Sequence, residues 1–133
     1  HTREILERGG NVIGLDQDPD SIARVKQELA QYISSNRLEI VQVNFSEVVS
    51  AVQSSELGKD RLKGVDGVLF DLGVSSHQID MPDRGFAFRF ENSPLDMRMG
   101  GAVDEKSATA ADIVNTLDAE SLADLLYTYG EER

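Results

Sequence analysis

The amino-acid sequence predicts an α/β protein built on a parallel β-sheet. Three short apolar runs, at residues 11–16, 38–43 and 65–72, have the length of buried strands. Between them, apolar residues recur at the three-to-four-residue spacing of amphipathic helices. Strands separated by helices form βαβ units, whose strands run in the same direction, so this alternation favours a parallel sheet.

The helices of the first half can be placed from their ends. Residues 2–8 have the composition of a helix end, which Gly9 and Gly10 close with a turn. Asp18 can cap the next helix, in which Pro19 suits the first turn. Its apolar face consists of Ile22, Val25, Leu29 and Ile33. Ser46 is expected to cap a third helix, whose apolar residues are Val48, Val49, Val52 and Leu57.

The alternation stops after the third predicted strand. Residues 75–106 show no sustained period, and such a long irregular segment in a compact domain is more often functional than filler. Two helices are then expected, at residues 108–117 and 119–129, the second capped by Asp118 and ended by Gly130.

Composition limits the classes of function. The chain has 133 residues, of which 40% are hydrophobic, enough for one domain with a core. It has no cysteine, which excludes disulfides and thiolate metal sites, and no apolar run near the roughly 20 residues that cross a bilayer. The net charge of −11 argues against a nucleic-acid partner, although Arg84, Arg89 and Arg98 form a local basic segment.

Asp16 ends the first predicted strand. A carboxylate at the carboxyl edge of a parallel sheet can accept hydrogen bonds from both hydroxyls of a nucleoside ribose, as in proteins that bind nicotinamide dinucleotides or S-adenosylmethionine. The alternative is an Asp that caps the following helix, a role that Asp18 can take instead. We therefore favour a cofactor ribose as the ligand of Asp16.

Two further side chains follow the second and third predicted strands. Phe45 can lie against an adenine face, although an aromatic here can also belong to the core. Asp71 stands at the tip of an apolar strand, where a carboxylate without partners is costly to bury, so a place at the binding edge gives it a use. The alternative is that Asp71 caps the turn into residues 75–78.

Other chemistries lack their motifs. His1 and His77 have no carboxylate or cysteine at ligand spacing, so no metal site is predicted. The sequence has no Ser-His-Asp order, no P-loop and no Gly-x-Gly-x-x-Gly, which leaves hydrolases, kinases and typical dehydrogenases without support.

Four blocks resemble one family. They are Asp71-Leu72-Gly73-Val74-Ser75-Ser76-His77-Gln78-Ile79-Asp80, Arg84-Gly85-Phe86-Ala87-Phe88, Pro94-Leu95-Asp96-Met97-Arg98-Met99 and Tyr129-Gly130-Glu131-Glu132-Arg133. In this order, over nearly the whole chain, they resemble the RsmH (MraW) family and its mitochondrial relatives. That family uses S-adenosylmethionine to methylate the exocyclic amine of a cytidine in small-subunit ribosomal RNA.

The resemblance implies roles for single residues. Asp16 would bind the cofactor ribose and Phe45 the adenine region. Asp71 and Gln78 would complete the cofactor and target pocket, with Asp71 also a candidate acceptor for the amine proton. His1 would end a Gly-Gly-His cofactor loop whose glycines are absent here. Two departures from the family pattern are Gln17, where Arg is common, and His77, where Pro is common.

The resemblance also implies a fold. Residues 1–74 would be a partial class I, Rossmann-like methyltransferase sheet without its first and last strands, and residues 75–133 the loop and opening helices of an inserted helical domain. The absent first strand would lie between the strands at 11–16 and 65–72, so we expect a gap or exposed edges in the sheet. The chain by itself is expected to be inactive.

The implied substrate gives the loop residues a possible task. Methyl transfer needs the amine about 3–3.5 Å from the methyl carbon and in line with it, and the target base unstacked. Candidates for phosphate or base contacts are Arg84, Phe86, Phe88, Arg89 and Arg98. The alternative is that the aromatic rings pack the insertion against the core. The partner would be small-subunit ribosomal RNA or the assembling subunit, in a bacterial cytoplasm or a mitochondrial matrix, with no membrane involved.

Three other functions fit parts of the sequence. A class I methyltransferase with another acceptor would keep Asp16 but has no need for residues 84–99. A non-catalytic ribosome-assembly factor could lose the cofactor contacts, against which the presence of Asp16, Asp71 and Gln78 argues. A nicotinamide-dependent oxidoreductase would need a Gly-x-Gly-x-x-Gly before His1.

Overall fold

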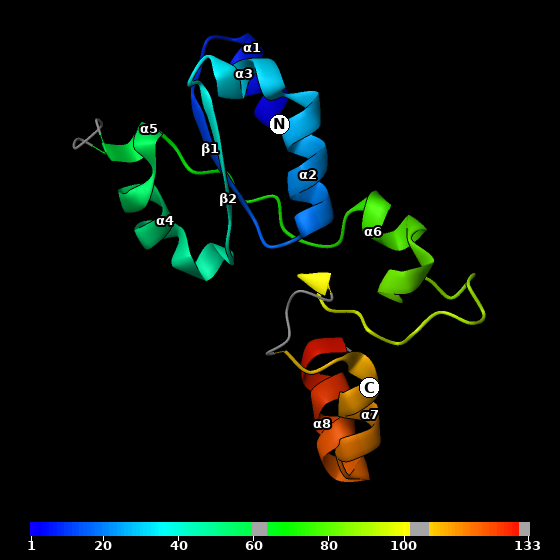
Figure 1. The fold of residues 1–133 in the computed structure, drawn as a ribbon. Helices are drawn as coiled ribbons and strands as arrows, with labels where there is room; N and C mark the ends of the chain where they lie inside the picture. Colours follow the sequence, from blue (N-terminus) through cyan, green and yellow to red (C-terminus); the bar gives the residue numbers. More distant parts are fainter. Residues whose placement is uncertain (60–63, 102–106, 131–133) are drawn as a thin grey trace. The chain divides into compact units, whose positions relative to one another are not determined.

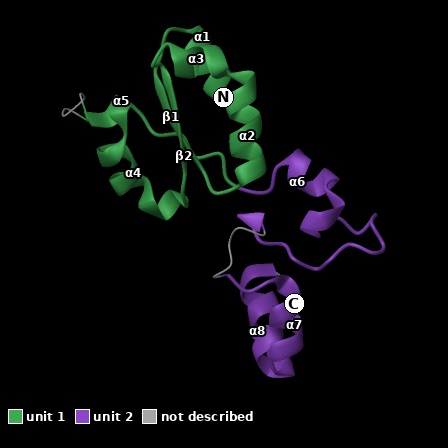
Figure 2. Ribbon diagram, in the orientation of Figure 1, with its two compact units in different colours: residues 1–72 green, residues 73–133 purple. Residues whose placement is uncertain are grey.

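The structure, a computed structural model, describes residues 1–59, 64–101 and 107–130. The chain divides into two compact units, unit 1 at residues 1–72 and unit 2 at residues 73–133 (Figure 2). The division lies close to the boundary expected after residue 74. That the two parts are a methyltransferase core and an inserted helical domain stays a prediction.

Unit 1 is built around two strands with helices on both sides (Figure 1). Figure 1 shows α2 and α4 on opposite sides of the strands. The elements are α1 (Thr2–Glu7), β1 (Val12–Asp16), α2 (Pro19–Glu28), α3 (Ala30–Ser34), β2 (Leu38–Gln42), η1 (Phe45–Glu47), α4 (Val48–Ser54) and α5 (Glu56–Lys59).

The two strands pair in parallel, with Val12 opposite Leu38 and Asp16 opposite Gln42. This confirms the mixed α/β class and the βαβ unit at its start. The crossover begins as predicted, because an Asp18 carboxylate oxygen accepts a hydrogen bond from the N–H of Asp20 at the start of α2. The single helix predicted as far as Ile33 is instead two helices that meet at Leu29.

The core of unit 1 lies between α1, the crossover and the strands. Leu6, Leu29 and Leu38 are buried together, and partly buried neighbours pack against them: Val12, Val25, Tyr32 and Ile40. A fully buried leucine contributes about 1.5–3 kcal/mol relative to an exposed one. The apolar residues that defined the predicted elements thus hold the crossover against the sheet.

The predicted third strand is wrong. In the described ranges, only β1 and β2 are paired strands, and residues 65–72 form no ladder. The side chains of Val68, Leu69, Phe70 and Leu72 are 57% to 66% exposed. A strand exists only where a neighbour exchanges hydrogen bonds with it, and these residues find none in the part of the chain that is described. The sheet is therefore not closed, as expected, but a Rossmann-like sheet is not established by two strands.

The start of the helix predicted at Ser46 is also wrong. The Asn44 side chain accepts a hydrogen bond from the N–H of Ser46 at 3.0 Å and caps η1, which precedes α4. Asn is as good an N-cap as Ser, and it comes first in the chain, so the first turn begins two residues early.

Unit 2 is mostly loop and helix. Its elements are α6 (Ser76–Asp80), η2 (Pro82–Arg84), α7 (Ala110–Thr116) and α8 (Ala119–Gly130). The two predicted final helices are confirmed, including the Asp118 cap, whose carboxylate accepts a hydrogen bond from the N–H of Ser121 at 2.9 Å. Of the last resemblance block, residues 131–133 lie outside the described residues.

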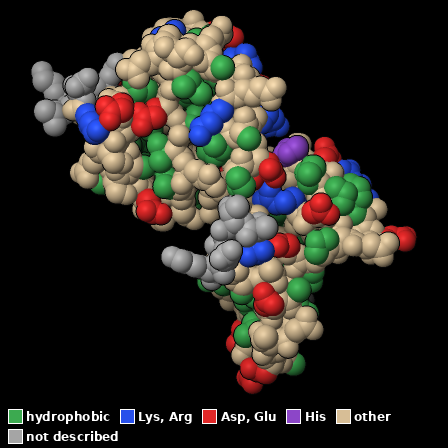
Figure 3. Space-filling view, viewed as in Figure 1, with side chains coloured by type: hydrophobic (Ala, Val, Ile, Leu, Met, Phe, Trp, Pro, Cys, Tyr) green, Lys and Arg blue, Asp and Glu red, His purple; other side chains and the backbone are tan. Residues whose placement is uncertain are grey.

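The final helical part of unit 2 carries only acidic charge. Residues 107–130 include four acidic residues and no Lys or Arg, and Figure 3 shows acidic side chains on the part formed by α7 and α8. No helix within the described ranges is long and apolar enough to span a bilayer.

Candidate functional site

The carboxyl ends of β1 and β2 lie side by side, because the strands are parallel and in register. Asp16, the last residue of β1, is exposed, and its Oδ1 accepts a hydrogen bond from the N–H of Asp18 at 2.9 Å. Its carbonyl oxygen accepts another from the N–H of Val43 at 3.0 Å. The backbone therefore fixes the orientation of a carboxylate that stays open to solvent, and Asp18 rather than Asp16 caps α2.

An amide pair joins the segments that follow the two strands. The Asn44 side-chain N–H donates to Oε1 of Gln17 at 3.1 Å, while the Asn44 oxygen caps η1. In the sequence, Gln17 stands out only as a departure from the family pattern. The strand register could have suggested the contact, because it places two amide side chains just beyond the paired residues Asp16 and Gln42.

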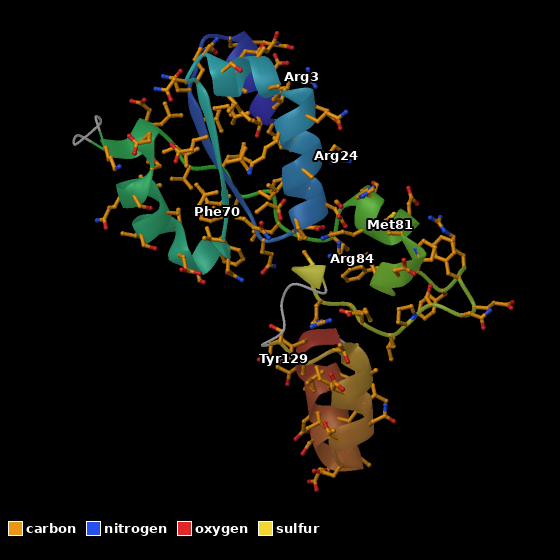
Figure 4. The ribbon with its side chains drawn as sticks, viewed as in Figure 1. Arg3, Arg24, Phe70, Met81, Arg84 and Tyr129 are labelled. Atoms are coloured by element: carbon orange, nitrogen blue, oxygen red, sulfur yellow. The ribbon has the colours of Figure 1, made fainter. Side chains whose placement is uncertain are left out.

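Phe45 faces the end of the apolar segment at 65–72. Its ring lies 6.4 Å from the ring of Phe70, centroid to centroid, in an edge-to-face arrangement at 81°. Phe45 is 52% and Phe70 60% exposed, so Phe45 does not belong to the buried core of unit 1 (Figure 4 labels Phe70). Aromatic pairs favour this edge-to-face geometry, which leaves ring faces available to a ligand.

The next residue, Asp71, meets the first residue of the chain. Its Oδ2 lies 3.5 Å from Nε2 of His1, and both side chains are mostly exposed. An exposed ion pair of this kind contributes only about 0–1 kcal/mol to stability. Its relevance to the site is that it places Asp71 beside His1. The alternative role for Asp71 is not observed, because Ser75 caps α6.

Three contacts link the segments of unit 1 that carry four predicted site residues. The amide pair connects the segment after Asp16 with the one before Phe45, the aromatic pair connects Phe45 with the residue before Asp71, and Asp71 meets His1. We call the four residues His1, Asp16, Phe45 and Asp71 the edge cluster. It combines two exposed carboxylates, an imidazole and an aromatic ring, a set that can bind a nucleoside by its ribose hydroxyls and base face.

Gln78 lies in unit 2 and is not one of the edge cluster. It is buried, its Oε1 accepts a hydrogen bond from the N–H of Ser75 at 2.8 Å, and its own N–H donates to Oγ of Ser75 at 3.2 Å. Its side-chain N–H also reaches the Met99 carbonyl oxygen at 3.5 Å. These bonds form a capping box that begins α6.

Two of the predicted RNA-contact arginines bind within unit 2. Arg84 is buried, and its Nη2 donates to the carbonyl oxygens of Arg98, at 3.1 Å, and Met99, at 2.7 Å. Arg98 forms a two-pronged pair with Asp96, with Nε to Oδ1 at 2.9 Å and Nη2 to Oδ2 at 2.7 Å. The Arg98 hydrogen bond lowers the pKa of the Asp96 carboxyl.

The other three candidates lie at the tip of the same loop. Arg89 pairs with Asp80, and its guanidinium carbon lies 4.9 Å from the centroid of the Phe90 ring. Phe86 is half-buried, whereas Phe88 is fully exposed. Among the residues that the structure describes, no three His, Asp or Glu side chains are grouped to hold a metal ion.

The sequence was then compared with known families. The whole chain, residues 1–133, matches the model of the MraW methylase family. The chain belongs to this family. The MraW resemblance of the four blocks is therefore confirmed.

Bacterial members of the MraW family are similar to the chain over its full length. It is 46% identical to a protein of Magnetococcus marinus and 46% identical to one of Gloeobacter violaceus, with 100% of the chain covered in each comparison. It is 43% identical to a protein of Caulobacter vibrioides over 99% of the chain. Each of these three relatives is named ribosomal RNA small subunit methyltransferase H. The chain spans 40%, 38% and 37% of their respective lengths.

Proposed function

We propose that the protein is an S-adenosylmethionine-dependent methyltransferase that acts on the exocyclic amine of a cytidine in small-subunit ribosomal RNA. Membership of the MraW family and the names of the relatives support this reaction class. The observation that supports the proposal is the edge cluster, whose segments are linked by the Gln17–Asn44, Phe45–Phe70 and Asp71–His1 contacts.

The edge cluster fits the nucleoside part of S-adenosylmethionine. The Asp16 carboxylate is exposed and held by the N–H of Asp18, so it can accept hydrogen bonds from both ribose hydroxyls. Phe45, held in place by Phe70 and the cap at Asn44, offers a ring to the adenine. S-adenosylmethionine supplies an electrophilic methyl group when bound.

Asp71 is the candidate acceptor for the amine of the target base. The lone pair of that amine is delocalised into the cytosine ring, so an acceptor that draws on its N–H makes it a better nucleophile. The Asp71 carboxylate is exposed and has His1 3.5 Å away, which can donate to it and restrict its orientation. Gln78 stays a predicted cofactor-binding residue, and within unit 2 its side chain takes part in the capping box that begins α6.

The partner would be small-subunit ribosomal RNA or the assembling subunit. The relatives compared above are bacterial, which supports a bacterial cytoplasm over a mitochondrial matrix. Neither another methyl acceptor nor a non-catalytic assembly role gains a supporting observation from the described residues.

Cofactor binding can be tested by calorimetric titration of the full-length protein with S-adenosylmethionine. Asp16→Ala removes two hydrogen bonds to a charged group, each worth about 1.5–3 kcal/mol, so affinity should fall at least about tenfold. The matched control is Asp66→Ala, which removes an exposed carboxylate that does not end a strand. Equal affinity of Asp16→Ala and wild type would rule out the proposed cofactor site.

The acceptor is tested separately, with the same protein and radiolabelled cofactor. Label should enter the RNA of small ribosomal subunits, at a cytidine amine. If the protein binds the cofactor but transfers no label to that RNA, the proposed cofactor site stands and the proposed substrate is wrong.

A further inference from the structure

Residues 81–101 of unit 2 form a loop whose two ends are fastened together. The buried guanidinium of Arg84 donates to the carbonyl oxygens of Arg98 and Met99. In return, the carbonyl oxygen of Arg84 accepts a hydrogen bond from the N–H of Met97 at 3.0 Å. Arg84, labelled in Figure 4, therefore joins the start of the loop to its end through both side chain and backbone.

Where the two ends of the loop are hydrogen-bonded to each other, the backbone conformation tolerates few other residues. Gly85 has φ +73, and a Cβ there would collide with the carbonyl oxygen of Pro94. Gly101 has φ +63, a left-handed conformation that would strain a residue with a Cβ. Met97 has φ +58, a left-handed conformation that costs a residue with a Cβ about 1–2 kcal/mol. Such strain persists only where surrounding contacts fix the backbone, so this loop has one defined conformation.

The tip of the fastened loop presents one aromatic ring to solvent. Phe88 has a relative exposure of 107%, that of a side chain with no neighbours. The adjacent Arg89 is drawn back to Asp80 and to the ring of Phe90. Single exposed apolar residues are common on proteins, but this one stands on a loop that is held from both ends.

The charges around the loop disfavour a phosphate contact. Arg84, Arg89 and Arg98 are all engaged inside unit 2, and residues 107–130 add four acidic residues and no Lys or Arg. An uncharged ring can bind the face of a nucleobase without the basic surface that phosphate binding requires. A fixed loop also loses little conformational entropy when its tip binds.

We propose that Phe88 is a stacking platform for an unpaired base of the RNA substrate, and that Arg84 is the positioning residue that fixes the loop carrying it. This rests on the proposed function, whose substrate must have an unstacked base. It replaces the view of residues 84–98 as a basic RNA-contact segment with a single aromatic contact.

Steady-state methyl transfer by the full-length protein to small ribosomal subunits tests the proposal. Stacking of a base on an aromatic side chain is worth about 1–3 kcal/mol, so Phe88→Ala should raise KM for the subunit at least about fivefold, with kcat little changed. Phe88→Trp should keep the wild-type KM. Tyr127→Ala, which removes an exposed ring from α8 in the same unit, should have no effect.

Two further measurements separate stacking from a structural role. Affinity for S-adenosylmethionine and the thermal midpoint should be unchanged in Phe88→Ala. The slope of log affinity for the isolated ribosomal RNA against log salt should also be unchanged, because no phosphate contact is lost.

Three results would overturn the proposal. They are an unchanged KM in Phe88→Ala, a parallel loss of cofactor affinity or thermal stability, and a KM effect on subunits with no effect on binding to isolated RNA, which would assign Phe88 to a ribosomal protein. A wild-type protein without methyl transfer would instead refute the proposed function, so the two failures are distinguishable.

Discussion

The arginines of residues 84–98 differ in what surrounds each guanidinium. Arg84 is buried against two carbonyl oxygens, Arg98 holds both oxygens of Asp96, and Arg89 pairs with Asp80. In sequence they form one basic segment, and in the structure each completes a local contact. Local charge density in the sequence therefore says little about the charge that this loop offers to a ligand.

The pair between Asp96 and Arg98 should make the loop sensitive to acid. The Arg98 hydrogen bond lowers the pKa of Asp96 in the folded state below its ordinary value of 3.8. The ionised pair therefore contributes its full stabilisation to the folded state above pH 3.8. The contribution is lost as the pH falls through the lowered pKa. Asp96→Asn should reduce the free energy of unfolding by about 1–3 kcal/mol at pH 7. Urea titrations at pH 7 and below pH 3 check this.

Comparing wild type with Asp96→Asn separates the effect of the Asp96–Arg98 pair on stability from that of the other acidic residues. The pKa values of Asp112 and Asp118 are lowered too, by hydrogen bonds from Thr109 and Ser121. The stability lost when these two carboxylates are protonated is therefore the same in wild type and variant. The difference between the two proteins should shrink as the pH falls below 3.8, through the lowered pKa of Asp96. A difference that stays constant with pH would show that the ionised carboxylate is not what stabilises the loop.

Predictability from sequence depends on the kind of partner that a residue has. Asp16 could be placed at the strand edge because strand periodicity locates it, and Asp18 because helix capping has a fixed residue preference. The partners of Arg84 are backbone carbonyls 14 and 15 residues away, which any sequence would supply. No residue pattern could have revealed that contact.

At the scale of elements, the loop at 81–101 should depend on Arg84 far more than on Arg89. Arg84→Met removes two hydrogen bonds of a buried guanidinium, which should cost about 1–3 kcal/mol of unfolding free energy, although Gln78 still reaches the Met99 carbonyl oxygen and the N–H of Gly101 that of Arg98. Arg89→Met, the matched control, removes an exposed ion pair and should cost no more than about 1 kcal/mol. Chemical denaturation of the two variants compares them directly, and equal losses would contradict the fastening role of Arg84.

The strands show why element prediction succeeded in one place and failed in another. Residues 11–16 and 38–43 were identified by apolar composition, and they pair because the α2–α3 crossover brings them together. Residues 65–72 have the same composition but no strand beside them in the described chain. Composition reports that a segment is suited to burial, whereas the ladder depends on a neighbour that composition does not identify.

At the scale of the whole molecule, the two units have different tasks in the proposed function. Unit 1 carries the edge cluster, which fits a nucleoside cofactor, and unit 2 carries the fastened loop and Phe88. Cofactor affinity and RNA affinity should therefore respond to substitutions in different units. The apolar segment at 65–72, at the end of unit 1, contributes Phe70 and Asp71 to the first task, whereas Val68, Leu69 and Leu72 have no part in either.

That apolar segment should dominate the surface behaviour of the 133-residue chain. Val68, Leu69, Phe70 and Leu72 are consecutive or nearly so and are all more than half exposed, and an exposed apolar patch binds apolar probes and promotes association. Leu69→Glu should lower binding of an apolar fluorescent dye and raise solubility while changing the thermal midpoint little, because Leu69 is already 57% exposed. The matched control, Leu38→Glu, places a charge in the core beside Leu6 and should unfold unit 1. A fall in the midpoint for Leu69→Glu comparable to that for Leu38→Glu would contradict the exposure of residues 65–72.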